Sequence, residues 1–174
     1  MEEKKLSKVT LGKLSHVGIV VIDLDKAMEY YASVFGLGPF TTEVYDLKSF
    51  VYRGRTASAR VKAAIAYSGP VFVELVQVLE GETVHTEFLR DKGEGLQHVA
   101  FLVRNLDDKL KELAKSGVEP AMRLRIPIAT PADQAGMAKK TRLELTEVYL
   151  DSDKIGGTMI QFMEFKEMPA SVSQ

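Results

Sequence analysis

Cysteine is absent from all 174 residues, which excludes disulfides, thiolate nucleophiles and cysteine-ligated zinc or iron–sulfur sites. An excess of charge is also missing: 23 Lys+Arg face 24 Asp+Glu, so no electrostatic case exists for binding nucleic acid or anionic lipid. No uncharged stretch approaches the roughly 20 residues needed to cross a bilayer. The composition therefore indicates a cytoplasmic protein whose partner is a small molecule, and any metal ion must be held by nitrogen and oxygen.

The sequence repeats itself at long range. The segment HVGIVV at 16–21 aligns with HVAFLV at 98–103, and both copies continue through a Leu-Asp pair to a Gly…Pro ending. Each copy predicts a strand, a helix capped by Asp23 or Asn105, and a glycine-containing stop. Three strand-like runs follow each helix, at 42–50, 60–67 and 71–77 in the first copy and at 121–128, 141–150 and 158–165 in the second.

This pattern predicts an α+β fold with two tandem βαβββ modules in one domain, 1–174. Module one spans about 14–79 and module two about 96–165. A short linking helix is expected at about 82–93, with Phe88 and Leu89 inward and His85 on the surface. The segment 127–140 is the least regular part and predicts a long loop within a hairpin.

Strand parity predicts a cluster of four polar residues. Alternate side chains of a strand face opposite sides, so packing Val17 and its alternate neighbours under a helix leaves His16 on the cavity face. The same parity places His98 there in module two. Glu74 and Gln161 occupy equivalent positions of the two closing strands, and both face the same way. Because duplicated units commonly pack about a pseudo-twofold axis, all four are expected to meet at one point.

Two imidazoles, a carboxylate and an amide oxygen suit one divalent ion such as Zn²⁺, Co²⁺, Ni²⁺, Mn²⁺ or Fe²⁺. A different interpretation is open for each residue: a lone strand histidine is commonly a core residue, and Gln161 would serve equally as a polar wall. Glu74, if buried unpaired, would cost several kcal/mol, so it needs a cation or a solvated cavity. Glu164 has the opposite parity to Gln161 and is expected to point away. No cofactor other than the metal ion is indicated.

The segment from Ser15 to Phe165 resembles the vicinal oxygen chelate superfamily, which includes glyoxalase I, methylmalonyl-CoA epimerase, extradiol dioxygenases and resistance proteins. The resemblance is carried by SHVGIVV at 15–21, FVELVQ at 72–77, GEGLQHVAF at 93–101, and YLD at 149–151 followed by Gly156-Gly157. It implies an open, partly closed β-barrel around a cavity, metal ligands at the four positions above, and a homodimer.

One departure from that pattern matters for function. Epimerases and glyoxalases of this kind generally carry glutamate where this chain has Gln161, and an amide cannot act as a general base. Glu74 would then take the catalytic role, or another carboxylate such as Glu43 or Glu147 would reach the cavity, or the chemistry differs. The expected activity is a metal-dependent epimerase, isomerase or lactoylglutathione lyase-like reaction, in which a proton is abstracted next to a metal-chelated carbonyl.

Two alternatives of other classes stay open. A resistance-type protein would sequester its ligand in the same cavity, and an Fe²⁺ dioxygenase would need its carboxylate on the strand where Gln161 stands. For an epimerase or lyase the substrate would be a CoA thioester or a thiol adduct. Phosphates of a CoA group would meet basic side chains at the cavity mouth, for which the candidates are Arg53, Arg55, Arg60, Arg123, Arg125, Lys139 and Lys140.

Overall fold

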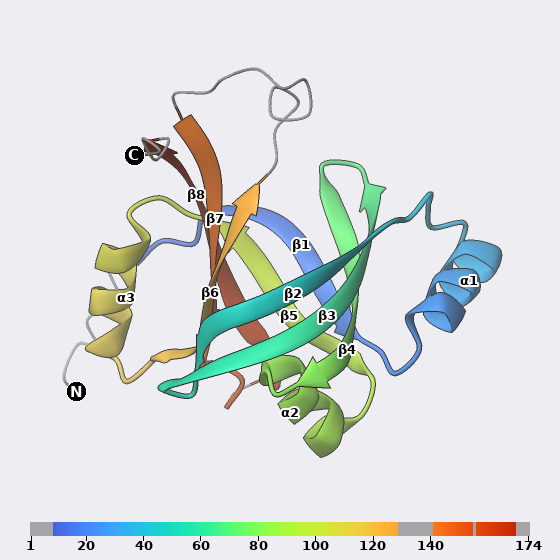
Figure 1. Ribbon diagram of the computed structural model, residues 1–174, viewed down its shortest axis with the longest axis horizontal. Coiled ribbons are helices and arrows are strands. Elements are labelled where there is room, and N and C mark those ends of the chain that lie inside the picture. The colour runs from blue at the N-terminus through green and yellow to red at the C-terminus, as the bar shows by residue number, and fades with distance from the viewer. Residues whose placement is uncertain (1–8, 129–140, 155, 170–174) are drawn as a thin grey trace, which may run out of the picture.

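The computed structural model describes residues 9–128, 141–154 and 156–169. Within them, eight strands and three helices follow one another as two similar series joined by a helix (Figure 1). The first series is β1 (Lys13–Val20), α1 (Leu24–Phe35), β2 (Thr41–Tyr52), β3 (Arg55–Ser68) and β4 (Val71–Gly81). After α2 (Val84–Lys92) come β5 (Gly95–Leu102), α3 (Leu106–Ala114), β6 (Pro120–Ile128), β7 (Thr141–Leu150) and β8 (Met159–Pro169).

The strands form one closed barrel in the order β1-β4-β3-β2-β6-β7-β8-β5. The predicted α+β fold with two βαβββ modules is confirmed, and closure is more complete than the expected partly closed barrel. The two modules meet at two seams. Along β1 and β5 the antiparallel pairing is extensive, whereas β2 and β6 pair only through Val51 with Arg123 and Tyr52 with Met122. The second seam is therefore short. The domain limits drawn from the sequence stay a prediction.

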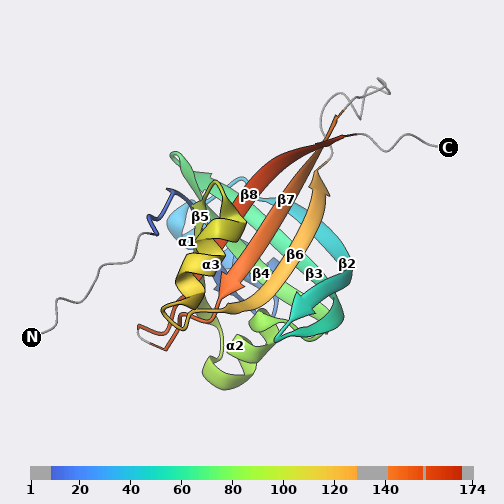
Figure 2. The same cartoon turned by 90° about the vertical axis from the view of Figure 1, so that its left-hand side faces the viewer.

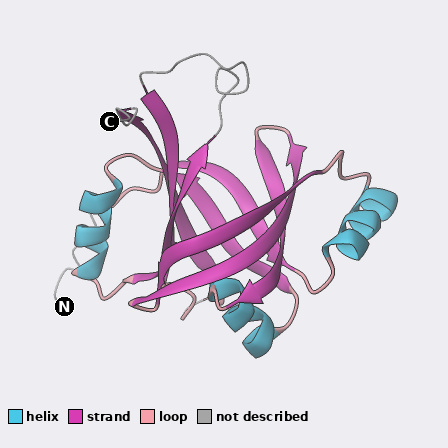
Figure 3. Ribbon diagram, viewed as in Figure 1, coloured by secondary structure: helices cyan, strands magenta, loops and turns pink. Residues whose placement is uncertain are grey.

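The helices lie outside the barrel, α1 and α3 on opposite sides and α2 across one end (Figures 1 and 2). Val21, Leu24 and Leu75 pack together under α1, and Val103, Leu106 and Phe162 pack under α3. Figure 3, coloured by secondary structure, shows the strands forming the barrel and the helices outside it. A further apolar cluster includes Phe50, Val76 and Met122.

Two local expectations differ from the structure. The first hairpin is longer than predicted, because β2 continues to Tyr52 and β3 begins at Arg55. Arg53 and Gly54 form the connecting turn with φ of 48° and 76°, the left-handed pair typical of tight hairpins, and arginine is uncommon in that conformation. Asn105 stands before α3 with φ of 56° but makes no side-chain cap hydrogen bond. The cap is supplied from elsewhere, as described below.

Among the described residues no helix is both long enough and apolar enough to span a membrane.

Candidate metal centre and cavity

Three predicted site residues meet inside the barrel. The Nε2 atoms of His16 and His98 lie 3.2 Å apart, and Glu74 Oε2 lies 3.5 Å from the first and 3.4 Å from the second. Both histidine side chains are fully buried, while one fifth of the Glu74 side chain is exposed. The three atoms thus form a nearly equilateral triangle, and only the Glu74 corner is partly exposed. Of the described His, Asp and Glu residues, only these three make a group of this kind.

Strand register explains why the three residues meet. β1 runs parallel to β4 and antiparallel to β5, and Gly18 is the residue on β1 that pairs with both Glu74 and His98. A methyl group at position 18 would come within 1.9 Å of the His98 ring. Glycine is therefore required here, because the imidazole occupies the space where a side chain would stand.

His16 is held by its own neighbours. Its ring stacks on Phe72 at 4.5 Å between centroids with 20° between planes, and its Nδ1 lies 3.3 Å from Ser15 Oγ. The ring meets that of His98 nearly edge-on, at 5.3 Å. The Nε2 edges therefore face one another, which is unfavourable for two lone pairs unless a proton or a cation lies between them.

Gln161, the fourth predicted residue, lies one strand away. β8 pairs in parallel with β5, and Gln161 lies opposite Ala100, which shares the inner face of β5 with His98. The side chain is fully buried, and its Oε1 has no hydrogen-bond partner among the described residues. A buried carbonyl oxygen without a partner is costly, so an unpaired acceptor on the face that carries the cluster has the chemistry of a metal ligand. Its role as a ligand stays a prediction.

Glu74 is ionised in this setting. Burial opposes its charge, but hydrogen bonding and charge interaction with His16 and His98 outweigh burial and hold the pKa of Glu74 well below its usual range. Burial likewise lowers the pKa of His98, partly offset by the Glu74 carboxylate. A carboxylate with such a low pKa is a good metal ligand and a poor proton acceptor, so Glu74 is less suited to the catalytic role that the sequence suggested.

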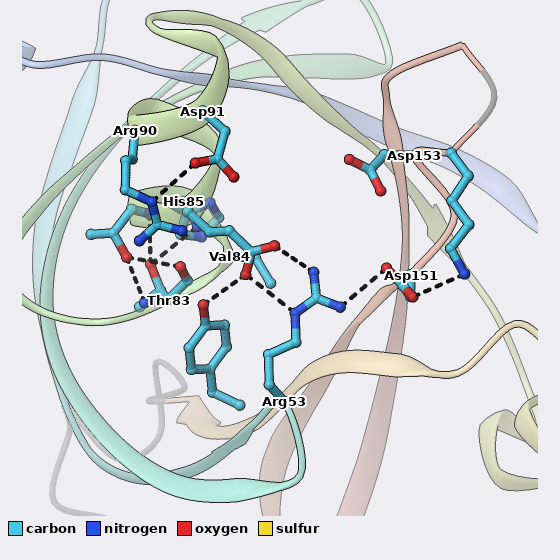
Figure 4. A network of polar contacts seen from close by, with 12 residues as sticks. Arg53, Thr83, Val84, His85, Arg90, Asp91, Asp151 and Asp153 are labelled. Carbon is cyan, nitrogen blue, oxygen red and sulfur yellow. Dashed lines mark hydrogen bonds and ion pairs between the residues drawn. The ribbon is translucent and has the colours of Figure 1, made fainter.

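Glu74 is the member of the cluster that lines a cavity inside the barrel, and the empty volume of this cavity is about 600 Å³ when its open mouth is counted. Most of the wall is apolar, and the polar wall residues are Tyr45, Glu74, Thr83, His85, Glu147 and Tyr149. His85 is buried here, so the prediction that it lies on the surface is wrong. It is the second residue of α2, and Figure 4 shows this first helical turn, where the Thr83 hydroxyl accepts hydrogen bonds from the backbone N–H groups of His85 and Thr86. Periodicity predicts this helix, but it does not reveal that the first turn of α2 lies across one end of the barrel with His85 at the cavity.

Glu147 is the second carboxylate of the cavity. It lies on the inner face of β7 between Leu145 and Tyr149, all three of which line the wall. Burial, reinforced by the negative charge of Glu74, raises the pKa of Glu147 to about 8. Glu147 and Glu43 are the two further carboxylates that the sequence suggested for the cavity, and only Glu147 lines it. Glu43 is exposed and accepts a hydrogen bond from Tyr45 outside the cluster.

Glu164 points away from the cluster, as parity predicted. Its Oε1 accepts a hydrogen bond from the backbone N–H of Leu106, the first residue of α3, and its Oε2 pairs with Lys166 at 2.7 Å. This carboxylate caps α3 in place of Asn105, because a positive φ at Asn105 turns its side chain away from the helix.

The residues present fit a divalent ion. Two buried imidazoles with converging Nε2 atoms, one ionised carboxylate oxygen and one unpaired amide oxygen make a nitrogen and oxygen donor set of moderate hardness. Zn²⁺, Co²⁺, Ni²⁺, Mn²⁺ and Fe²⁺ all accept such donors, and the donor types alone do not select among them.

A paired-module barrel with histidines and a carboxylate at its centre defines the vicinal oxygen chelate class. Residues 15–134 match the family described as the glyoxalase/bleomycin resistance protein/dioxygenase superfamily, and the chain belongs to it. Over 109 residues it is 29% identical to the uncharacterized protein YqjC of Bacillus subtilis, covering 63% of this chain and 70% of that protein. It is also 30% identical over 109 residues to the mitochondrial methylmalonyl-CoA epimerase of Mus musculus, covering 62% of this chain and 55% of the mouse protein.

Solved structures agree on the fold. A hypothetical protein from Bacillus halodurans superposes with a TM-score of 0.52 at 23% identity, covering 91% of this chain and 97% of that one. The methylmalonyl-CoA epimerase of Mycobacterium tuberculosis gives 0.50 at 22% identity, covering 96% and 94%. A 4-hydroxymandelate synthase variant from Streptomyces coelicolor gives 0.55 at 14% identity, covering 92% of this chain and 50% of that one. At these identities the likeness shows the fold alone.

Proposed function

We propose that the protein is a metal-dependent epimerase or isomerase that removes a proton from the carbon next to a carbonyl group. The observation that carries this proposal is the triangle of His16, Glu74 and His98 at the wall of a cavity that also contains the separate carboxylate Glu147. Proton removal next to a carbonyl requires a metal site for the carbonyl oxygen, a separate base for the proton, and a wall that keeps water away from the substrate. The similarity to methylmalonyl-CoA epimerases supports the same class.

The charge states of the site residues suggest separate roles for them, metal binding for one set and proton transfer for Glu147. His16, Glu74, His98 and Gln161 would hold the ion, which when bound supplies a Lewis acid that stabilises negative charge on the carbonyl oxygen. Glu147 takes up the α-proton, because its raised pKa makes it a stronger base than an ordinary carboxylate. The apolar wall excludes water and surrounds the uncharged part of the substrate. Glu147 therefore replaces Glu74 as our proposed catalytic base.

The proposed substrate is a carbonyl compound small enough for the cavity, either a CoA thioester or a thiol adduct. One methylmalonyl-CoA epimerase structure contains methylmalonyl-CoA, and a Streptomyces coelicolor epimerase variant contains 2-nitronate-propionyl-CoA, which makes acyl-CoA compounds the first to try. The basic residues suggested for CoA phosphates have acidic partners in this structure, and Lys139 and Lys140 lie outside the described residues. The ion pairs are Arg53 with Glu87 and Asp151, Arg55 with Glu82, Arg60 with Asp46, Arg123 with Asp107, and Arg125 with Glu144.

Solvent deuterium exchange tests the proposal. Protein loaded with Co²⁺ or Ni²⁺ is incubated in D₂O with methylmalonyl-CoA, and with the methylglyoxal–glutathione adduct, and the α-proton is followed by NMR. We expect exchange with at least one substrate, lost in Glu147→Gln and in His98→Ala. Failure of the purified protein to take up about one ion per chain would instead favour a protein that sequesters its ligand without turnover.

A second candidate function is an Fe²⁺ oxygenase. His16, His98 and Glu74 supply two histidines and one carboxylate around one point, the donor set of non-haem iron oxygenases, although the carboxylate comes from β4 and not from β8. Oxygen uptake by the Fe²⁺-loaded protein with catechol or a 2-oxo acid would support it, and absence of uptake alongside α-proton exchange would exclude it.

A further inference from the structure

One buried amide, Gln97, connects the metal cluster to the cavity wall. Gln97 is fully buried beside His98, and its Nε2 lies 2.8 Å from the backbone carbonyl of Val84. A carbonyl oxygen can only accept, so the atom facing it must be the NH₂ group. This contact fixes which way the amide is turned, and its Oε1 must point in the opposite direction.

That oxygen serves two histidines at once. Gln97 Oε1 lies 2.7 Å from His85 Nδ1 and 2.9 Å from His98 Nδ1. Because an amide oxygen has no hydrogen to give, both Nδ1 atoms must be the donors. In the neutral ring the proton then sits on Nδ1 and the lone pair on Nε2, so a single side chain sets the tautomer of both imidazoles.

For His98 this tautomer is the one that binds metal. Its Nε2 lone pair points to Glu74 and His16, at 3.4 Å and 3.2 Å. A partner that holds the far nitrogen of a ligand histidine orients the ring and raises its basicity. Gln97 is therefore a positioning residue for the metal cluster.

For His85 the same tautomer leaves an acceptor at the cavity. The ring lines the cavity, and its Nε2 has no hydrogen-bond partner among the described residues. Two contacts keep the ring in place: the Thr83 capping box fixes the first turn of α2, and Tyr149 meets the rings of both His85 and His98 edge-on, each at 5.1 Å. A rigid imidazole with a free lone pair is a binding group for a hydrogen-bond donor.

We propose that Gln97 sets the Nδ1–H tautomer of His85 and His98 together, and that His85 Nε2 selects substrates with an O–H or N–H donor beside the chelated oxygen atoms. The second half rests on the proposed function, since it concerns the ligand of the same site. Of the two kinds of substrate proposed above, it favours the thiol adduct, whose hydroxyl lies next to the carbonyl, over methylmalonyl-CoA, which has no such donor. Carbonyl compounds without that donor would leave the buried lone pair unpaired, which is unfavourable.

The tautomers are tested by ¹⁵N NMR of the histidine side chains in metal-free protein. Both His85 and His98 should show a protonated Nδ1 in the wild type. Gln97→Met, which has similar size and no acceptor, should lose this preference at both rings. Gln77→Met is the matched control, because Gln77 Oε1 accepts only from Leu24 N on the outer side of β4. A wild-type ring without a proton on Nδ1, or unchanged Nδ1 protonation in Gln97→Met, would overturn the first half.

The acceptor role is tested with two chelators that differ in one donor. Acetohydroxamate and N-methylacetohydroxamate bind a metal through the same pair of oxygens, but only the first has an N–H group. With Zn²⁺-loaded protein, calorimetry should show about fivefold tighter binding of the first, the factor expected from one hydrogen bond of about 1 kcal/mol. His85→Phe should remove that preference while still binding Zn²⁺.

The outcomes separate the two proposals. If the ratio of the two hydroxamate affinities were the same in wild type and in His85→Phe, that result would contradict the acceptor role. Absence of Zn²⁺ binding would contradict both the proposed function and the acceptor role of His85, whereas the role of Gln97 is decided by the NMR result alone.

Discussion

At the scale of single residues, the site depends on Gly18 having no side chain. Gly18 leaves room for the His98 imidazole, since a methyl group there would lie 1.9 Å from the ring. We expect Gly18→Ala to push His98 away from Glu74, to weaken Zn²⁺ binding at least tenfold, and to lower the free energy of unfolding by about 1–3 kcal/mol, the usual cost of overpacking. Calorimetry with Zn²⁺ and urea denaturation measure the two effects.

A double-mutant cycle provides the control for Gly18. In a His98→Ala background the space beside residue 18 is empty, so adding Gly18→Ala should cost much less than it does alone. Equal costs in both backgrounds would mean that the substitution acts on the β1 backbone and not on the histidine.

Glu147 should be a site where function opposes stability. Its pKa is raised from an ordinary value of 4.5 in the unfolded chain to about 8, so the folded state holds a proton that the unfolded state releases. Stability therefore falls as pH rises from about 4.5 to about 8. We expect metal-free Glu147→Gln to be about 1–2 kcal/mol more stable than wild type at pH 8 and equal to it at pH 4. Urea denaturation at the two pH values checks this, and a less stable variant at pH 8 would contradict the burial of that carboxyl.

The residues of the site differ in how visible they are in the sequence. The repeat and strand parity indicate His16, Glu74 and His98 together, because each is polar at an inward position of an apolar strand. His85 and Gln97 follow no such rule. Gln97 precedes a predicted ligand, so strict alternation would place it on the opposite face of β5. It lies where the pairing of β1 with β5 is irregular, because Gly18 pairs with His98 and Ile19 with Leu96, and its amide contacts Val84 of α2. Packing between elements, which a periodicity analysis does not include, decides both positions.

At the scale of the elements, the two equivalent helices start in different ways. Asp23 caps α1 itself, accepting from Lys26 N at 3.1 Å, whereas α3 is capped by Glu164 of β8. We expect Asp23→Ala and Glu164→Ala each to lower the free energy of unfolding by about 1 kcal/mol. Asn105→Gly should be neutral or slightly stabilising, since glycine tolerates its φ of 56° and no cap bond is lost.

Urea denaturation of these three variants measures the difference. Glu164→Gln is the matched variant for Glu164→Ala, because its amide oxygen can still accept from Leu106 N. A loss of about 1 kcal/mol in Asn105→Gly would show that the asparagine, and not Glu164, caps α3.

The sequence predicts the elements well where their pattern is regular. Strands, helices and the change between modules follow from hydrophobic periodicity and from the cap and stop residues. The β2–β3 turn escaped prediction because Arg53 adopts a positive φ without being Gly, Asn or Asp. The cap of α3 escaped because its acceptor lies 58 residues away in the chain. In both cases a contact distant in sequence outweighs the local preference.

At the scale of the whole molecule, one arginine joins three parts of the fold. Arg53, at the β2–β3 turn, donates to Asp151 after β7 (Figure 4) and to Glu87 of α2. Its backbone N–H donates to Ala121 O at 2.8 Å, next to the β2–β6 seam. We expect Arg53→Met to lower the free energy of unfolding by about 1 kcal/mol at pH 7, a modest value because the side chains are partly exposed.

This contribution should depend on pH in a defined direction. Hydrogen bonds from Arg53 hold the pKa values of Glu87 and Asp151 below their usual range. The stabilisation is then complete above the ordinary carboxyl pKa, roughly pH 4 to 5, and is lost as pH falls through the lowered values. The difference in stability between wild type and Arg53→Met should therefore shrink as the pH falls below about 4. Arg55→Met is the control, since its pair with Glu82 is exposed and should contribute less than about 0.5 kcal/mol.

The expected homodimer stays a prediction, which light scattering of the purified protein would check.

Because the two seams differ in length, the barrel should open locally between β2 and β6 more readily than between β1 and β5. Parting β2 from β6 breaks the pairing of only two residues on each strand, whereas parting β1 from β5 would disrupt the strands that carry both histidines. Native-state hydrogen exchange should therefore show lower protection factors for the amides of Arg53 and Met122 than for those of Val17 and Val99. β2 and β6 would then separate transiently on the side of the barrel opposite the cluster. A ligand could enter there while β1 and β5, which carry the two histidines, stay paired.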